Sequence, residues 1–294
     1  MNVRNKFRAL LAEPGLTLIP GAYDALSARI IEAQGFAAIG AGGYAAVGSL
    51  LAQPDTGQSN MRDYADHYAR ICAAVELPVY VDGDTGFGGV NNARQMVRAF
   101  EAAGVAALFV SDQTFPNRCG YLPGKEVVPV EQMLAKIKAM LDARRDQDLV
   151  VCARTDAAGV AGRGLDAAIE RCQLFMEAGA DMAKPMGADT IDDIKRVIRE
   201  VGGPHIATIS QAAGAKHRDL GELEAAGELA LFAAAQAVRQ AVATLKRDRS
   251  LAGVSERLMP LPDYYELIGL KAQLDREESY DRAAAVLVNK RAAE

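Results

Sequence analysis

Short apolar runs rich in strand-forming residues alternate with helical patterns about every 30 residues, and this alternation limits the fold more than any other sequence feature. It predicts eight strands, at residues 17–20, 37–41, 78–82, 106–111, 149–153, 181–185, 205–209 and 229–232. Four helical segments end in a Glu-Ala pair followed by a glycine, placed where a left-handed residue closes a helix. Because strands joined by helical crossovers run parallel, eight such units predict an α/β fold, a closed (β/α)8 barrel of the TIM type. A doubly wound open sheet is the alternative.

We expect one barrel domain over residues 1–294, with helices added at both ends. An amphipathic helix near the N-terminus carries Phe7, Leu10 and Leu11 on one face. A helical extension, residues 258–294, follows the eighth barrel helix. Pro260 and Pro262, near its start, separate it from that helix. This extension has more apolar residues than a barrel must cover, among them Tyr265, Leu267, Ile268 and Leu270. We expect one C-terminal helix to be swapped onto a neighbouring subunit of a homo-oligomer; packing on its own barrel is the alternative.

Composition and charge argue against several classes of protein. Half of the 294 residues are hydrophobic, which is enough for a core of ordinary size. The chain has 33 Lys and Arg against 38 Asp and Glu, a net charge of -5 without a block of either sign, so we expect no nucleic-acid partner. No apolar stretch is long enough to span a membrane, and the four cysteines, which lack CxxC pairing, read as reduced thiols. These features predict a cytoplasmic protein.

Acidic residues cluster after the strand predicted at 78–82. That strand ends in VDGDTGFGG, which places Asp82 and Asp84 two residues apart among glycines, and Asp55 follows an earlier unit in LAQPDTG. Barrel active sites lie at the carboxyl ends of the strands, and paired carboxylates suit a hard cation such as Mg2+. The alternative is that the two aspartates cap the next helix or fix the turn.

Two further segments carry groups suited to catalysis. The strand at 149–153 leads into ARTDA, where Arg154 can bind a carboxylate through two hydrogen bonds while Asp156 orients it; a purely structural ion pair is the alternative. A long loop, SDQTFPNRCGYLPGKEVVP, follows the strand at 106–111 and has the length of a lid. It carries Cys119 next to Arg118, an electropositive setting that favours a reactive thiolate.

The segments PGAYDALSARIIEAQGF, VDGDTGFGG, DQTFPNRCGYLPGKEVVP and ARTDA together resemble the isocitrate lyase and phosphoenolpyruvate mutase superfamily, over nearly the whole chain. The cysteine-bearing loop is most similar to the branch of 2-methylisocitrate lyases and dimethylmalate lyases. The resemblance implies a Mg2+-dependent barrel, with Mn2+ as a possible substitute. It also implies a swapped C-terminal helix, assembly as tetramers or as dimers, and cleavage of a substituted 2-hydroxy di- or tricarboxylate into an α-keto acid and a second carboxylate.

The resemblance also implies a role for single residues. Asp82 would hold the metal directly, while Asp84 and Asp55 would act through bound water. The backbone of Gly42, Gly43 and Tyr44 corresponds to the segment that receives a substrate carboxylate, and Arg154 would add positive charge. Cys119, beside Gly120 on the lid, would be the acid that protonates the enolate left by bond cleavage, and the other catalytic candidates are Arg154 and Tyr44.

Several positions depart from the family pattern and leave the substrate open. The departures are Gly42 for serine, Ser111 for glutamate, Tyr121 for histidine, Met186 for glutamate, Thr208 for asparagine and Gln211 for glutamate. Lys184 lies two residues before Met186 on the same strand face, and we expect it to supply positive charge to the substrate, with Thr208 as a further binding residue; an outward-pointing lysine is the alternative. An oxaloacetate-type hydrolase or decarboxylase, a phosphonate mutase and a non-catalytic small-acid binder stay open beside the lyase.

Overall fold

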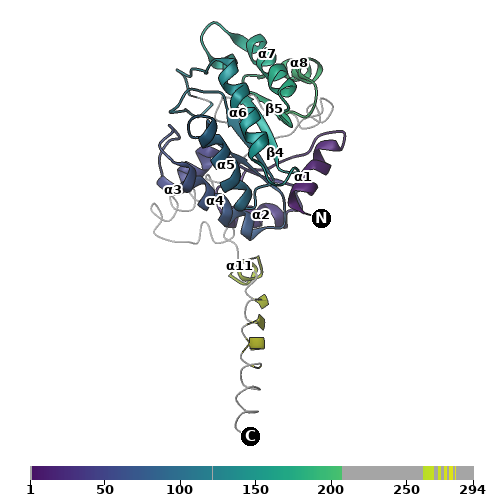
Figure 1. The fold of residues 1–294 in the computed structure, drawn as a ribbon. Coiled ribbons are helices and arrows are strands. Elements are labelled where there is room, and N and C mark those ends of the chain that lie inside the picture. The colour runs from purple at the N-terminus through teal and green to yellow at the C-terminus, as the bar shows by residue number, and fades with distance from the viewer. Residues whose placement is uncertain are drawn as a thin grey trace, which may run out of the picture. The chain divides into compact units, whose positions relative to one another are not determined.

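Five parallel strands form one sheet in chain order, β1-β2-β3-β4-β5. Figure 1 labels β4 and β5 of this sheet and the helices around it. The computed structural model describes residues 2–120, 122–206, 261–267, 271–272, 275–276, 278–280 and 282. The strands are β1 Ile39–Ala41, β2 Val79–Asp82, β3 Ala107–Ser111, β4 Val150–Thr155 and β5 Met182–Pro185. Each strand pairs with its neighbours in the sequence, whereas a doubly wound sheet reverses its strand order. The fold is therefore of the barrel type, and the open-sheet alternative is wrong.

Single bridges extend the sheet beyond both of its outer strands. Gly21 forms a parallel bridge to Gly40, so the segment predicted as the first strand contributes a bridge in place of a strand. On the other side Ala183 forms a parallel bridge to His205, the first residue of the predicted seventh strand. Residues 207–209 and the predicted eighth strand, 229–232, lie outside the described residues.

Helices follow the strands as the alternating pattern predicts. Their bounds are α1 Val3–Ala12, α2 Ala25–Ala33, α3 Gly43–Leu51, α4 Met61–Ala74, α5 Val90–Ala102, α6 Val130–Ala143, α7 Gly164–Glu177, α8 Ile191–Val201 and α11 Leu261–Leu267, with a short 3₁₀ helix at Ala157–Gly159. The glycines after α5 and α7, Gly104 and Gly179, have φ of +88° and +97°. Beyond each, a backbone bond returns to the helix, from Val105 to Phe100 and from Ala180 to Phe175, so the glycine turns the chain into the next strand.

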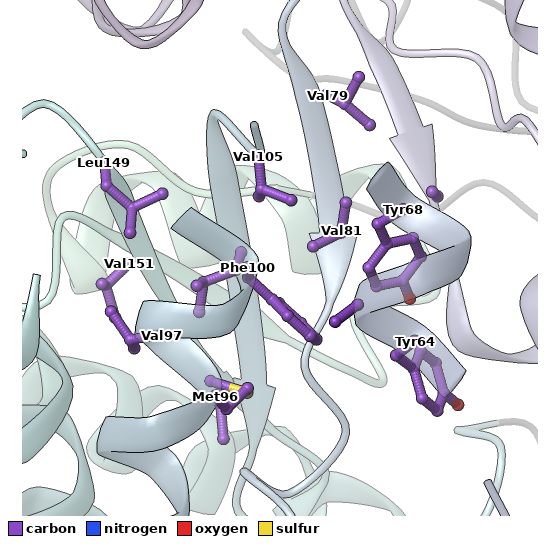
Figure 2. Packing of buried hydrophobic residues seen from close by; sticks show 14 of the residues in the cluster. Tyr64, Tyr68, Val79, Val81, Met96, Val97, Phe100, Val105, Leu149 and Val151 are labelled. Atoms are coloured by element: carbon purple, nitrogen blue, oxygen red, sulfur yellow. The ribbon is translucent and has the colours of Figure 1, made fainter. Parts of the chain in front are cut away.

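The outward faces of the strands form the main core with the surrounding helices. Val81 of β2 and Val151 of β4 lie in one buried cluster with side chains of α4 and α5, among them Tyr68 and Phe100 (Figure 2). The rings of Tyr68 and Phe100 meet edge to face with centroids 5.4 Å apart. This packing fixes the strands in register, because alternate residues must face the helices.

The inward faces of the strands form a second core, and α1 packs against it. Tyr80, Phe109 and Cys152 point inward from β2, β3 and β4 and cluster with Phe7 of α1. The rings of Phe7 and Tyr80 stack with centroids 6.1 Å apart and planes 9° apart. The predicted amphipathic helix is confirmed, and its apolar face covers the amino-terminal end of the strands.

The chain contacts separate two units, residues 1–233 and residues 234–294. In the second unit the described residues are helical, with α11 at Leu261–Leu267. The extension predicted at 258–294, and its exchange between subunits, stay predictions. Among the helices that the structure describes, none has the length and apolarity needed to cross a membrane.

Candidate active site

Three charged side chains reach the inside of the barrel from the carboxyl ends of different strands. Asp82 ends β2, while Arg154 of β4 and Lys184 of β5 are direct partners in the strand register. All three are buried, with exposures of 7% to 8%. Ser111 of β3 pairs with Arg154 from the other side. The predicted site residues on these strands therefore share one end of the sheet, where barrel enzymes place their chemistry.

Asp82 is fixed by backbone donors on both of its carboxylate oxygens. Its Oδ1 accepts a hydrogen bond from the Asp84 amide at 2.8 Å, and its Oδ2 accepts one from the Gly43 amide at 3.0 Å. Asp84 itself has a left-handed backbone, with φ of +53°. Asp82 thus takes part in fixing the turn after β2, and its binding of a metal stays a prediction. At the start of the next helix, α5, the Gly89 amide donates to the Asn92 side chain and not to either aspartate.

The other two acidic side chains keep carboxylate oxygens without a partner. Oδ1 of Asp55 and Oδ2 of Asp84 are buried and accept no hydrogen bond. Burial, and then the charge of Asp82, raises the pKa of Asp55 to about 6 and the pKa of Asp84 to about 7. Such a cluster favours either protons or a cation, because three buried negative charges repel one another.

The carboxylates fit a hydrated divalent cation better than a closed cage. Among the residues that the structure describes, no three Asp, Glu, His or Cys side chains converge closely enough to coordinate one ion together. Mg2+ typically takes one or two carboxylates and keeps several waters. The orphaned oxygens of Asp55 and Asp84 could accept hydrogen bonds from such waters, so the residues present fit the implied metal.

Arg154 is held in one orientation by Asp156. Its Nε and Nη2 donate to the two Asp156 oxygens at 2.8 and 2.9 Å, and the Ser111 hydroxyl donates to the same carboxylate at 2.9 Å. Burial alone would raise the pKa of Asp156, but Arg154 and Lys125 lower it to about 2. Asp156 stays ionised and keeps Arg154 charged, and Nη1 of Arg154 is not used in this pair.

The loop predicted as a lid packs against Arg154. The Cys119 amide donates to the Asp55 carbonyl at 3.1 Å, and Lys125 bonds the Gly120 carbonyl and pairs with Asp156 at 3.5 Å. A Cβ atom on Gly120 would collide with Nη2 of Arg154 and lie 3.0 Å from Met186 Cε. Only glycine lets the lid approach this closely. The backbone of Cys119 is thereby held at Asp55 and Gly120 at Arg154, while the catalytic role of Cys119 stays a prediction.

Lys184 points into the barrel, and the outward alternative is wrong. Its Nζ lies 3.8 Å from the centroid of the Phe109 ring and 5.9 Å from that of Tyr80, both inward-facing residues. Burial, and then the neighbouring Arg154, lowers the pKa of Lys184 to about 8, against the opposing effect of Asp82. The site thus contains a second cation on the aromatic layer that forms its floor.

The remaining predicted site residues lie at the start of α3 or outside the described residues. Gly42 is the N-cap of α3 and Tyr44 lies half-buried in its first turn, while the Gly43 amide is directed at Asp82. Their binding of a substrate carboxylate stays a prediction. Thr208, Tyr121 and Gln211 lie outside the described residues.

Sequence reasoning missed two supports of the site. The side-chain amide of Gln113 forms two hydrogen bonds with the backbone of the lid. Its Nε2 donates to the Arg118 carbonyl at 2.9 Å, and its Oε1 accepts from the Arg118 amide at 3.0 Å. Asp112 accepts from Arg171 of α7 at 2.7 Å and from the Thr155 hydroxyl at 2.6 Å. The signal was the Ser-Asp-Gln run after β3, three adjacent polar residues at the end of a buried strand.

Comparisons with known proteins agree with this geometry. Residues 7–250 match the family model described as phosphoenolpyruvate phosphomutase. The 2,3-dimethylmalate lyase of Eubacterium barkeri is 34% identical over 95% of this chain and 99% of its own length. The 2-methylisocitrate lyase of Aeropyrum pernix is 33% identical over 96% and 92%.

Solved structures of the same group share the fold. Oxaloacetate acetylhydrolase with 3,3-difluorooxalacetate superposes with a TM-score of 0.87 at 27% identity, over 95% of this chain and 97% of that one. Phosphonopyruvate hydrolase with oxalate and Mg2+ gives 0.83 at 29% identity, over 95% and 99%. The chain belongs to the phosphoenolpyruvate phosphomutase family, in the superfamily that also contains the isocitrate lyases.

Proposed function

We propose that this protein is a Mg2+-dependent carbon-carbon lyase that cleaves a small substituted 2-hydroxy di- or tricarboxylate. The products are an α-keto acid and a second carboxylate. The observation that carries the proposal is the meeting of Arg154 and the aspartate cluster beneath the loop that bears Cys119. Relatives named dimethylmalate and methylisocitrate lyases support it.

The aspartate cluster would hold the metal, with Mg2+ or Mn2+ as the ion. Asp82 would bind it directly, and Asp84 and Asp55 would bind its waters. When bound, the cation supplies a fixed positive charge beside the oxygen on which negative charge develops. The Mg2+ and oxalate in the solved phosphonopyruvate hydrolase support this assignment.

The remaining steps use side chains of this chain. Arg154, oriented by Asp156, binds a substrate carboxylate through its remaining N–H groups, and the first turn of α3 at Gly42 to Tyr44 receives another. The closed lid excludes water from the enolate that bond cleavage leaves. Cys119 then donates a proton to the enolate carbon, as general acid.

Lys184 adds a positive charge that suits a further carboxylate of the substrate. Met186, beside the lid, replaces a glutamate expected at that position, so the end of β5 loses one negative charge and gains one positive charge relative to the family pattern. We propose that this shift favours substrates that carry an extra anionic group over neutral side chains. Thr208 would contribute its hydroxyl to the same substrate.

The test is a substrate screen with the purified full-length protein. Incubation with Mg2+ and 2-methylisocitrate, isocitrate, dimethylmalate, citramalate or oxaloacetate should release an α-keto acid from a 2-hydroxy acid, and EDTA should abolish the release. Release of oxalate or CO2 from oxaloacetate alone would favour a hydrolase or a decarboxylase. The solved oxaloacetate acetylhydrolase superposes well on this chain. Calorimetric binding of oxalate without any turnover would indicate a binding protein.

We also propose a homo-oligomer in the cytoplasm, a tetramer or a dimer with swapped C-terminal helices. The apolar residues of the extension support exchange, and the four free cysteines support a reducing compartment. Light scattering of the full chain and of a chain ending at residue 257 tests the assembly. Loss of the oligomer on truncation is the expected result.

A further inference from the structure

Lys184 is a buried amine that has no hydrogen-bonding or ion-pairing partner among the residues that the structure describes. Its side chain is 8% exposed, and its Nζ rests on the faces of Phe109 and Tyr80. Burying an ammonium without an acceptor is costly, so a ligand or a reaction at this position is a more economical explanation than a structural role.

Other lysines close to the site have a structural task. Lys136 donates to the Thr85 carbonyl at 2.9 Å. Lys125 bonds the Gly120 carbonyl and pairs with Asp156. Lys184 differs from both because its amine is directed into the barrel and toward aromatic rings. The amine is therefore available to a molecule bound at the site.

The surroundings of Lys184 are those that make a lysine a nucleophile. A lysine amine attacks carbonyl carbon only when neutral, and it is activated by an apolar pocket or by another cation nearby. Lys184 has both, since the aromatic floor removes water and Arg154 is its register partner on β4. The pKa of about 8 agrees with this setting.

Arg154 and Lys184 lie opposite each other on neighbouring strands, and both cations lie over the Phe109 ring, at 5.8 Å and 3.8 Å from its centroid. Neighbouring strands lie roughly 4.8 Å apart. Arg154 can hold a carboxylate through the N–H groups that Asp156 leaves unused, and β5 with Lys184 is the next strand. In an α-keto acid the carboxylate and the carbonyl are joined by a single bond, so one bound molecule can meet both residues.

We propose that Lys184 condenses with the carbonyl of an α-keto acid of the pyruvate class bound at Arg154, and forms an imine. The nitrogen adds to the carbonyl carbon and a carbinolamine forms; the carbon-oxygen bond then breaks, and the oxygen leaves as water. No oxidant or reductant is consumed. The inference rests on the proposed function in that such a keto acid is the expected product. Imine formation gives the protein a covalent hold on that product and makes the protons on its C3 acidic.

The test is reductive trapping on the full-length protein. Cyanoborohydride and pyruvate should add the mass of one reduced pyruvate imine per chain, and peptide mapping should place the adduct on Lys184. Deuterium should also enter C3 of pyruvate in D2O without reductant. Lys184→Arg keeps the charge but lacks the nucleophilic amine, and its labelling should fall by about tenfold or more. Lys138→Arg, an exposed lysine on α6, is the matched control and should label as the wild type does.

The outcomes separate this inference from the proposed lyase. Labelling of Lys184 without cleavage of any 2-hydroxy acid would support the imine and reject the lyase. Cleavage of a 2-hydroxy acid without labelling at Lys184 would overturn the inference and leave the lyase intact. Equal labelling of wild type and Lys184→Arg would also overturn it, because the adduct would then lie on other amines. The wild-type peptide map decides the question even where the variant folds poorly.

Discussion

Replacing Gly43 with alanine should displace Asp82 from the position at which we propose it holds the metal. A Cβ atom on Gly43 would lie 2.8 Å from Asp82 Oδ2, 3.2 Å from its Cγ and 3.0 Å from the Tyr64 hydroxyl oxygen, whereas ordinary contact begins at about 3.4 Å. The carboxylate must therefore retreat by about half an ångström or more. This movement also weakens the 3.0 Å hydrogen bond from the Gly43 amide, which contributes about 1.5–3 kcal/mol as a bond to a charged group.

We expect Mg2+ or Mn2+ binding to weaken by about tenfold or more and kcat/KM for keto-acid release to fall by about 10- to 100-fold, as misplacement of a positioning group by up to an ångström can do. The assays are metal titration by calorimetry and continuous measurement of keto-acid release. Gly48→Ala is the matched control, because it lies on the same helix with nothing within 4 Å of its Cβ. Alanine there should leave both quantities unchanged and stabilise α3 by up to about 1 kcal/mol.

Metal binding and turnover at wild-type levels in Gly43→Ala would contradict this prediction. Such a result would mean that Asp82 tolerates the displacement or does not bind the cation. Equal losses in Gly43→Ala and Gly48→Ala would point to a general defect of α3, which thermal unfolding of both variants would reveal.

Three other changes test the lid and its supports. Cys119→Ser should bind oxalate normally but lose about 10²–10⁴ in kcat, because a hydroxyl is a far weaker acid; unchanged turnover would remove the thiol from the mechanism. Asp156→Asn should lower the free energy of unfolding by about 3–5 kcal/mol at neutral pH, since Arg154 loses its buried counter-charge. Because the pKa of Asp156 is depressed to about 2, its contribution is fully present above pH 4 and is lost as pH falls toward 2; acid denaturation should therefore be steeper for the wild type than for Asp156→Asn. Arg171→Met should cost about 3–5 kcal/mol in chemical denaturation by stranding Asp112, and a loss below about 1 kcal/mol would show that the pair is not needed.

Local sequence patterns were sufficient for β1 to β5, the helix ends and the acidic turn, but not for residues 17–20, which form no strand. The alternation located β1 to β5, and the Glu-Ala-Gly pattern located the left-handed glycines Gly104 and Gly179. These features depend on residues close together in the chain, so their signal is readable. The family resemblance then related Asp82, Arg154 and Cys119 to one site.

The remaining features depend on contacts between distant segments. Arg171 reaches Asp112 across 59 residues, and no local pattern announces that pair. The face on which Lys184 lies was equally open, because strands of a parallel sheet are buried on both sides and give no alternation. Its inward position follows from Met182, which shares its face and packs with the inner core.

The aromatic contact between Phe7 and Tyr80 gives the first turns of the chain an influence on chemistry at the opposite end of the barrel. Tyr80 touches Phe7 below, and its ring lies 5.2 Å from Phe109, which in turn supports the Lys184 amine. Three neighbouring rings, one pair stacked and one pair tilted, thus connect α1 to the Lys184 amine. Deletions or tags before residue 13 should therefore alter the reactivity of the Lys184 amine, and an affinity tag is better attached elsewhere.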